Sequence, residues 1–362
     1  MMPKGRVDLA TTCDMILPAG AIGELARQAE VMRAIGSPFV AEVLAAGERH
    51  LAQAPRTAAM LAEWPGDPAA AAVAMRFNAA LHALARRDTP ATLGALYRGE
   101  HHDVDAAVRG ALTKHDSFIA AWMRDPPQTN EVGRAAAILA ALMVVRARDG
   151  LPVELLELGS SAGLNLNLAH YDYDLGGLCV GDARSAVRIV PEWRGAPPPD
   201  RQVAVVAAQG VDLHPLAPDD PATCERLMAY VFADQPLRSA RLAHALALAR
   251  RHPPQVTRAD AANWLETRLA EAQPAARGRI VFHSMMLQYV APDERERIVG
   301  AIRAAGARAD ATRPLSWISF EWTAARTAVE LRLTCWPGGD THVLATCHPY
   351  GAWIEWKGER AR

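Results

Sequence analysis

The pattern of apolar positions divides the chain into two parts near residue 150. From about Glu24 to Arg148, apolar residues recur every three or four positions in an alanine-rich background, which predicts four to six helices and almost no strand. From Leu151 onward, short β-rich runs alternate with helical stretches, a pattern typical of an open parallel α/β sheet. We therefore expect an all-helical cap domain over residues 1–150 and a Rossmann-like α/β domain over residues 151–362.

Seven runs in the second part predict strands, with helices between them. The expected strands are Val153–Leu158, Val203–Val211, Gln255–Arg258, Arg279–His283, Leu315–Phe320, Leu331–Trp336 and His342–Cys347. The expected helices are Leu164–Tyr171, Ala222–Arg251, Ala261–Ala272 and Pro292–Ala304. The last two strands flank Pro337–Asp340, so the sequence predicts a seven-stranded sheet with an antiparallel terminal hairpin. The Gly/Pro-rich insertion between Tyr173 and Arg201 is expected to form a small hairpin of its own.

Composition and charge exclude several classes of protein. The 362 residues are 50% hydrophobic and carry 39 basic and 40 acidic side chains, which excludes a disordered tail and a polycation and argues against a nucleic-acid partner. Five cysteines without a C-x-x-C motif predict a reducing, cytoplasmic location. The longest apolar stretch, at 135–145, is too short for a membrane span, and His101 and His102 lack further ligands for a metal. We expect neither a membrane nor a metal site.

The segment Val153–Leu166 predicts a strand, a turn of small residues and a helix, which together suggest a nucleotide site. Ser161 stands where dinucleotide folds place a second glycine, which weakens a pyrophosphate site. Glu157 lies two residues before Gly159, and this spacing resembles motif I of the class I S-adenosylmethionine (SAM) methyltransferases. The candidate ligand-binding residues here are Glu157, Gly159, Ser160, Ser161, Ala162, Gly163 and Asn165.

Acids end the next two predicted strands. Asp212 is the candidate for the vicinal hydroxyls of a ribose, because a carboxylate offers two acceptor oxygens. Asp260, followed by Ala261, resembles the acid that methyltransferases direct to the adenine amino group. Glu192 is closer than Asp212 to the glycine turn in the sequence and is an alternative ribose ligand. Each acid could instead cap a helix or form a loop ion pair.

Polar residues also gather upstream of the first strand, at the start of an apolar helix that could lie across the ligand. The candidates are Gln128, Asn130, Glu131 and Arg134. Arg134 could pair with the carboxylate of a methionine moiety, whereas capping and a structural salt bridge are the alternative.

The reaction centre is expected near the end of the fourth strand, at His283 and Ser284. Candidate general bases are His283, Tyr289, Glu321 and His348, each of which could instead be structural.

Taken together, these segments resemble an uncharacterised bacterial family, domain of unknown function 2332. Its members carry Q-T-N-E-x-G-R followed by E-x-G-x-S-A-G-L-N-L, which stand here at Gln128–Arg134 and Glu157–Leu166. The resemblance to SAM methyltransferases implies SAM as the cofactor and a small molecule as the acceptor. We therefore expect a methyltransferase-like protein.

Two other functions remain open. Gly159–Gly163 also satisfies G-x-S-x-G, so Ser161 could be a hydrolase nucleophile with Asp260 and His283, or with Asp340 and His348. The helical first 150 residues argue against that fold, because it needs several strands before the nucleophile. A non-catalytic protein that binds a nucleoside or a partner is the second alternative.

Overall fold

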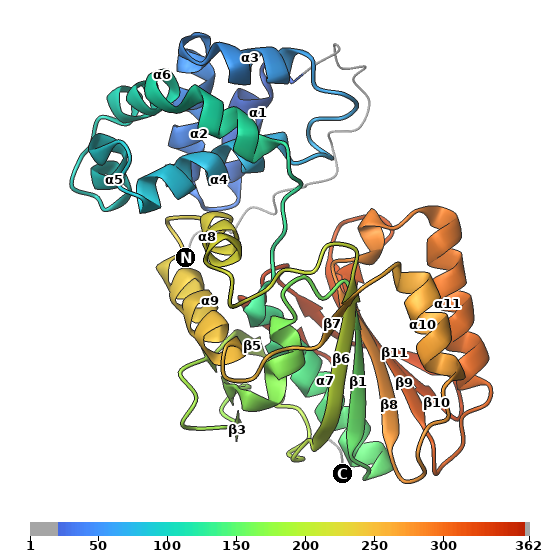
Figure 1. The fold of residues 1–362 in the computed structure, drawn as a ribbon. Coiled ribbons are helices and arrows are strands. Elements are labelled where there is room, and N and C mark those ends of the chain that lie inside the picture. The colour runs from blue at the N-terminus through green and yellow to red at the C-terminus, as the bar shows by residue number, and fades with distance from the viewer. Residues whose placement is uncertain (1–20, 359–362) are drawn as a thin grey trace. The chain divides into compact units, whose positions relative to one another are not determined.

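The computed structural model describes residues 21–358, which form two compact units. A helical unit contains residues 21–129 and 220–240, and a sheet unit contains residues 130–219 and 241–358 (Figure 1). The division differs from the expected boundary at residue 150. Helix α7 (Ala135–Asp149) packs on the sheet, and helix α8 (Pro221–Ala229) packs on α4 (Val73–Arg86) of the helical unit. Cys13 lies outside the described residues, and no disulfide joins the four cysteines within them.

The helical unit is built from short helices. It contains α1 (Glu24–Ala34), α2 (Pro38–His50), η1 (Leu51–Gln53), α3 (Pro55–Ala62), α4, α5 (Ala91–Tyr97), α6 (Val104–Met123) and α8. From residue 21, where the described part of the chain begins, seven α-helices precede the first strand, α7 included, so the prediction of four to six was too low. The additional helix boundaries fall at Ala54, before the proline that begins α3, and between Arg98 and Asp103.

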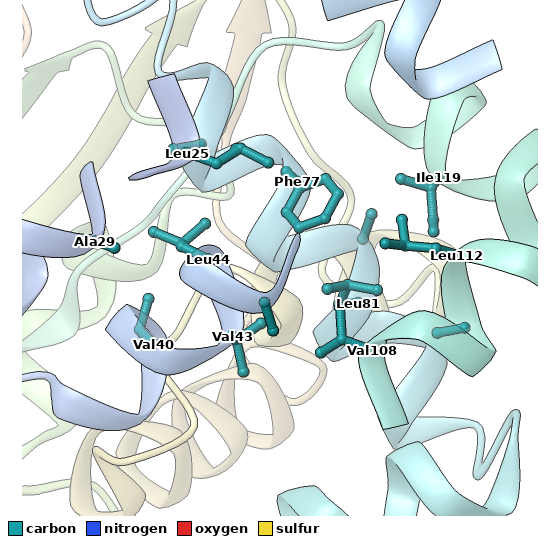
Figure 2. Packing of buried hydrophobic residues seen from close by; sticks show 14 of the residues in the cluster. Leu25, Ala29, Val40, Val43, Leu44, Phe77, Leu81, Val108, Leu112 and Ile119 are labelled. Atoms are coloured by element: carbon teal, nitrogen blue, oxygen red, sulfur yellow. The ribbon is translucent and has the colours of Figure 1, made fainter. Parts of the chain in front are cut away.

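The core of the helical unit is formed by apolar side chains of α1, α2, α4 and α6 (Figure 2). Leu25, Leu44, Phe77 and Leu112 are fully buried there. Gly47 of α2 faces the ring of Phe77, and a Cβ at this position would meet the Cζ atom at 2.7 Å. A glycine therefore allows α2 and α4 to approach closely.

Polar and aromatic contacts hold α8 to the other helices of this unit. The guanidinium of Arg226 lies 5.0 Å from the ring centroid of Trp122 and 5.6 Å from that of Tyr230. The Nδ1 atom of His82 on α4 lies 3.1 Å from the carbonyl oxygen of Ala229. The single helix expected at Ala222–Arg251 is wrong, because residues 230–235 separate α8 from α9 (Pro236–Ala249). A proline begins α9, where it needs no hydrogen-bonded N–H group.

The sheet unit contains two sheets. The large sheet has nine strands in the order β5-β12-β11-β10-β9-β8-β1-β6-β7. Its strands are β1 (Val153–Leu158), β5 (Glu192–Arg194), β6 (Val205–Asp212), β7 (Val256–Arg258), β8 (Gly278–Ser284), β9 (Leu315–Trp322), β10 (Val329–Trp336), β11 (Asp340–Cys347) and β12 (Trp353–Trp356). A small sheet has the order β3-β2-β4, from β2 (Asp172–Asp174), β3 (Cys179–Gly181) and β4 (Arg188–Ile189).

The architecture is mixed α/β with a large, mostly parallel sheet, and all seven expected strands are present. β7, β6, β1, β8 and β9 are parallel neighbours, whereas β9, β10, β11 and β12 pair antiparallel. The expected count of seven is corrected to nine by β12 and by β5, which comes from the insertion and pairs with β12. Both strands are too short for alternation to be read from the sequence. The expected hairpin in the insertion is the antiparallel pair β2 and β3.

Helices cover both faces of the large sheet (Figure 1). Helix α7 packs against β9, β10 and β11, and α10 (Ala261–Ala270) and α11 (Pro292–Gly306) pack against β6 and β9. Leu156 and Leu158 of β1 lie in the apolar cluster with α10 and α11. Because side chains alternate along a strand, Glu157 points to the opposite face.

Candidate functional site

The carboxyl ends of β1, β6 and β8 bring most of the expected site residues together. Chain order runs outward from β1 in both directions, to β6 and β7 on one side and to β8 and β9 on the other. In open α/β sheets, ligands bind outside the carboxyl ends of the strands at such a reversal. Glu157, Asp212 and His283 lie at or near these three strand ends.

The turn after β1 has three residues with left-handed backbone. Gly159, Ser161 and Gly163 have φ angles of +69°, +54° and +68°. At Gly163 a Cβ would lie 2.6 Å from Cβ of Pro254, so this glycine permits close packing against the segment that leads into β7. At Gly159 a Cβ would meet Cβ of Met286 at 2.9 Å. Met286, which was not among the residues expected at the site, therefore covers the open side of Gly159.

The helix expected after this turn is a seven-residue 3-10 helix, η3 (Leu164–His170). Tyrosines from the next segment hold it, because the hydroxyls of Tyr171 and Tyr173 donate to the carbonyl oxygens of Leu164 and Leu168. Both tyrosine side chains are fully buried. Residues 171–173, at the end of η3 and in β2, therefore help to hold η3 in place.

Backbone N–H groups of the turn donate within the protein. Those of Gly159 and Ser160 donate to the carbonyl oxygen of Val211, at 2.9 and 3.0 Å. The N–H of Ser161 donates to Oδ2 of Asp212 at 2.8 Å, and that of Gly163 donates to the carbonyl oxygen of Ser160. A phosphate-binding loop needs such groups free for its ligand.

Glu157 is the most deeply buried acid of the site. Its side chain is 2% exposed, and Oε2 has no hydrogen-bond partner within residues 21–358. Burial raises the pKa of the Glu157 carboxyl well above its usual range; the charge of Asp212 adds to the rise, whereas Ser160, Asn165 and the charge of Arg134 oppose it.

Two further buried oxygen atoms of this region have no partner among the described residues. They are Oγ of Ser161 and Oδ1 of Asn165, which belong to side chains that are 6% and 1% exposed. Buried polar atoms are normally hydrogen-bonded, so each such atom calls for an explanation. All three orphaned atoms are oxygens, and therefore a group rich in hydrogen-bond donors matches them best.

Asp212 is the last residue of β6, and its carboxylate accepts hydrogen bonds from the turn after β1 and from the residues that follow β6. Its Oδ2 accepts from the N–H of Ser161 at 2.8 Å, and its Oδ1 accepts from the N–H of His214 at 2.9 Å. Each carboxylate oxygen has a second lone pair, so Asp212 can still accept from a ligand.

Glu192, the alternative ribose ligand, lies on β5 and is six strands away from β1 in the sheet. At roughly 4.8 Å per strand, this places Glu192 far from the glycine turn.

Asp260 acts as the N-cap of α10. Its Oδ1 accepts from the N–H of Asn263 at 2.9 Å, and Ala261 is the first residue of the helix. A hydrogen bond with Glu294 on α11 lowers the pKa of Asp260, and the same contact raises the pKa of Glu294. The capping alternative therefore describes the contacts of Asp260 in this structure.

The upstream segment is divided between the two units. Gln128 belongs to the helical unit, whereas Asn130, Glu131 and Arg134 belong to the sheet unit. Oδ1 of Asn130 accepts from the N–H of Leu164 at 2.8 Å, so Asn130 fixes the start of η3. Oε1 of Glu131 accepts from the N–H of Gly133, the middle residue of η2 (Val132–Arg134).

Arg134 connects η2 to two other segments. Its Nε donates to the carbonyl oxygen of Pro349 at 2.9 Å, and Nη1 lies 3.3 Å from the carbonyl oxygen of Ser284. Arg134 is 8% exposed. It thus fixes the end of β8 and the β11–β12 loop around the site.

His283 and Glu321 form one buried network. Nδ1 of His283 lies 2.8 Å from Oε1 of Glu321, and the indole N–H of Trp317 donates to Nε2 at 3.0 Å. Because Nε2 accepts, the proton of the neutral ring is on Nδ1. The same Glu321 oxygen accepts from the N–H groups of Met286 and Leu287.

Burial raises the pKa of Glu321, but the hydrogen bonds from His283 and from the two N–H groups outweigh it and hold the pKa below its usual range. Both ring nitrogens of His283 are therefore engaged within the protein. Trp317, which supplies one of these bonds, was not singled out as a site residue from the sequence.

The other candidate bases differ in exposure. Tyr289 belongs to η4 (Leu287–Tyr289), and its side chain is 80% exposed. His348 is half-buried, and its Nδ1 accepts from the N–H of Tyr350 at 3.1 Å.

Neither expected hydrolase triad has the required contacts. The nitrogens of His283 bond to Glu321 and Trp317 rather than to Asp260 and Ser161. Asp340 begins β11, whereas His348 follows its last residue, so about 25 Å of extended strand separates them.

No group of three or more metal-ligating side chains occurs within residues 21–358, and no helix in the same range is long and apolar enough to cross a membrane.

A family model described as an uncharacterised protein conserved in bacteria (DUF2332) matches residues 23–356. The chain belongs to this family. The match includes both the helical and the sheet units. No curated protein matches the chain.

Proposed function

We propose that this DUF2332 protein binds S-adenosylmethionine at the carboxyl ends of β1, β6 and β8 and is a methyltransferase for a small-molecule acceptor. The five parallel strands have the chain order 3-2-1-4-5, which is that of doubly wound nucleotide-binding folds. This order supports a Rossmann-like, methyltransferase-type unit, to which the antiparallel β10, β11 and β12 are added.

The orphaned oxygens beside β1 carry the proposal. The Oε2 atom of Glu157, Oγ of Ser161 and Oδ1 of Asn165 are buried acceptors without partners among the described residues. A primary ammonium group has three hydrogens and a positive charge, so it supplies what these oxygens lack. SAM combines such an ammonium with a ribose, and Asp212 retains lone pairs for the ribose hydroxyls.

The backbone N–H groups of the turn already donate to protein oxygens, and this favours SAM over a dinucleotide as the ligand. Pyrophosphate binding relies on free backbone N–H groups at a glycine turn, and here four of them donate to protein oxygens. A ligand that is cationic at this point is therefore favoured over one that is anionic.

When bound, SAM would supply an activated methyl group on its sulfonium, and the protein would act mainly by positioning the acceptor in line with it. Glu157 and Asn165 would hold the ammonium end, and Asp212 the ribose. Of the four candidate bases, Tyr289 has an exposed side chain, whereas His283, Glu321 and His348 are engaged within the protein.

A binding experiment tests the proposal. Isothermal titration of the protein with SAM and S-adenosylhomocysteine, with NAD and adenosine as comparisons, should detect binding of the first two. Asp212→Ala should abolish this binding, whereas Glu192→Ala, which removes an exposed carboxylate paired with Arg194, should leave it unchanged. Folding of both variants is checked by circular dichroism. Absence of binding of both sulfur ligands to the wild type, or equal loss in the two variants, would refute the proposal.

The alternative of a non-catalytic nucleoside-binding protein shares this site, so binding alone does not separate it from an enzyme. Methyl transfer from labelled SAM to a panel of small acceptors does. The hydrolase alternative is tested by a serine-directed fluorophosphonate probe, which should leave Ser161 unlabelled.

A further inference from the structure

The carboxyl group of Glu157 has fewer partners than an ionised carboxylate requires, because the side chains of Ser160 and Asn165 hydrogen-bond to it but one of its two oxygens is left without a partner. It is 2% exposed, and Oε2 has no hydrogen-bond partner within the described residues. The hydroxyl of Ser160, which is next to it in the turn, donates to the main-chain carbonyl of Glu157 at 3.1 Å. An unpaired charge in such surroundings is strongly disfavoured, and the group keeps its proton instead.

Charged and titratable groups face Glu157 from three elements. Asp212 at the end of β6 contributes a negative charge, Arg134 of η2 contributes a positive one, and Tyr171 after η3 contributes a buried phenol. Arg134 donates to the carbonyl oxygens of Pro349 and Ser284, so its guanidinium is directed to other atoms. Burial favours the protonated form of Glu157 most strongly; the hydrogen bonds of Ser160 and Asn165 and the charge of Arg134 act against it, and the charge of Asp212 adds to it.

We propose that Glu157 is protonated in the ligand-free protein and releases its proton to solvent when a primary ammonium group binds against it. This rests on the proposed function in one respect, because the ammonium is assigned to SAM. In the step, the O–H bond of the carboxyl breaks, the proton passes to the buffer, and an N–H group of the ammonium takes its place. A neutral acid is thus replaced by an ion pair, and the net charge of the free pocket and of the bound pocket is the same.

Such a site couples affinity to pH. Below the pKa of Glu157 in the free protein, each pH unit of increase should raise the affinity for the ammonium up to tenfold, because less work is needed to remove the proton. The increase should end where Glu157 is already ionised, or where the ammonium itself loses a proton, near pH 8 for an ordinary α-amino group. Ligands without a cationic amine should show no such dependence.

The protonation state is tested first without a ligand. In protein labelled with ¹³C at the glutamate carboxyl carbons, one resonance should titrate far above the ordinary range of about 4.3 and should be missing from Glu157→Gln. Glu192→Gln, at an exposed glutamate of β5, removes a different resonance and serves as the matched control. Asp212→Asn should move the Glu157 titration to lower pH, since it removes a neighbouring negative charge. The inference is overturned if every carboxyl titrates in the ordinary range.

The release of the proton is tested by titrating wild-type protein with SAM near pH 7 in phosphate and in HEPES, neither of which has a primary amine. The enthalpies observed in the two buffers should differ by the number of protons released, which is at most one, multiplied by the difference between the ionisation enthalpies of the two buffers. Binding without proton release, and with pH-independent affinity, overturns this inference and leaves the proposed function standing. No SAM binding at all overturns the proposed function, while the carbon titration still decides the state of Glu157. Neither wild-type measurement depends on a variant that folds.

Discussion

Replacing Glu157 by glutamine should change how stability depends on pH, and this prediction needs no ligand. Burial raises the pKa of Glu157 in the folded protein, whereas the unfolded carboxyl titrates near about 4.3. Below that value both states hold the proton and the residue contributes no pH dependence. Between the unfolded and the folded pKa only the folded state holds it, so wild-type stability falls as pH rises. Glutamine has nearly the same shape and does not titrate, so it lacks this loss.

The size of this pH dependence follows from one proton that the folded state binds and the unfolded state does not. The free energy of unfolding of Glu157→Gln, relative to wild type, should rise by about 1.4 kcal/mol for each pH unit above about 4.3, up to the folded pKa. For a cooperative unit of 150–250 residues, this corresponds to a relative gain in Tm of roughly 3–6 °C per pH unit. Differences between the proteins are used because titrating groups that do not interact with Glu157 cancel.

Urea unfolding followed by circular dichroism, at half-unit steps from pH 4.5 to pH 8, measures this slope. The exposed Glu192→Gln protein should differ from wild type by a constant amount over the same range. A flat difference for Glu157→Gln, or one that decreases with pH, would refute the reasoning, since it would mean that the folded carboxyl releases its proton as readily as the unfolded one.

Two further predictions concern the turn and η3. Gly163→Ala should cost about 2–4 kcal/mol in urea unfolding, because it combines a left-handed backbone with a 2.6 Å approach to Pro254, whereas Gly177→Ala, with φ of +88° and open space around it, should cost about 1–2 kcal/mol. Equal losses would contradict the packing argument. Tyr171→Phe and Tyr173→Phe should each cost about 1 kcal/mol, since each removes a buried hydrogen bond to a carbonyl oxygen of η3, and thermal unfolding with unchanged Tm would exclude this role.

The sheet was predictable where strands are long and their connections regular. Val153–Leu158 was predicted with the bounds that the structure has, because its residues are apolar and a glycine turn follows at once. The three residues of β5 and the four of β12 give too little pattern, and they become strands only because they pair with each other and with β11. That pairing joins residues about 160 positions apart, and local sequence carries no information about it.

The assignment of residues 220–240 to the helical unit also depended on tertiary contacts. Nothing local in α8 distinguishes a helix that covers a sheet from one that joins other helices. Its position is fixed by Arg226 between Trp122 and Tyr230, and by an ion pair of Glu225 with Arg87. Trp122 and Arg87 lie about 100 residues or more from their partners in the sequence.

The candidate site was predicted by position more reliably than by role. Strand ends are set by the fold, and therefore Glu157, Asp212 and His283 could be placed near one edge from the sequence. What each side chain does depends on its neighbours: Trp317 and Glu321 occupy both nitrogens of His283. The resulting network makes His283 a fixed part of the wall rather than a free base.

The two acids nearest the turn are complementary, and this bears on how such a site can bind a cation. Asp212 receives the N–H groups of Ser161 and His214, so a negative charge is supported there by the backbone. Glu157 receives no comparable support at Oε2, and the charge of Asp212 makes its ionisation still less favourable. The acid that already has partners thus keeps the turn in shape when the site is empty, whereas the acid without partners becomes charged only when a cation arrives. Ionised Glu157 is stable in these buried surroundings only when it is paired with a cation. Selectivity for a cationic amine therefore follows from burial itself and requires no additional recognition group.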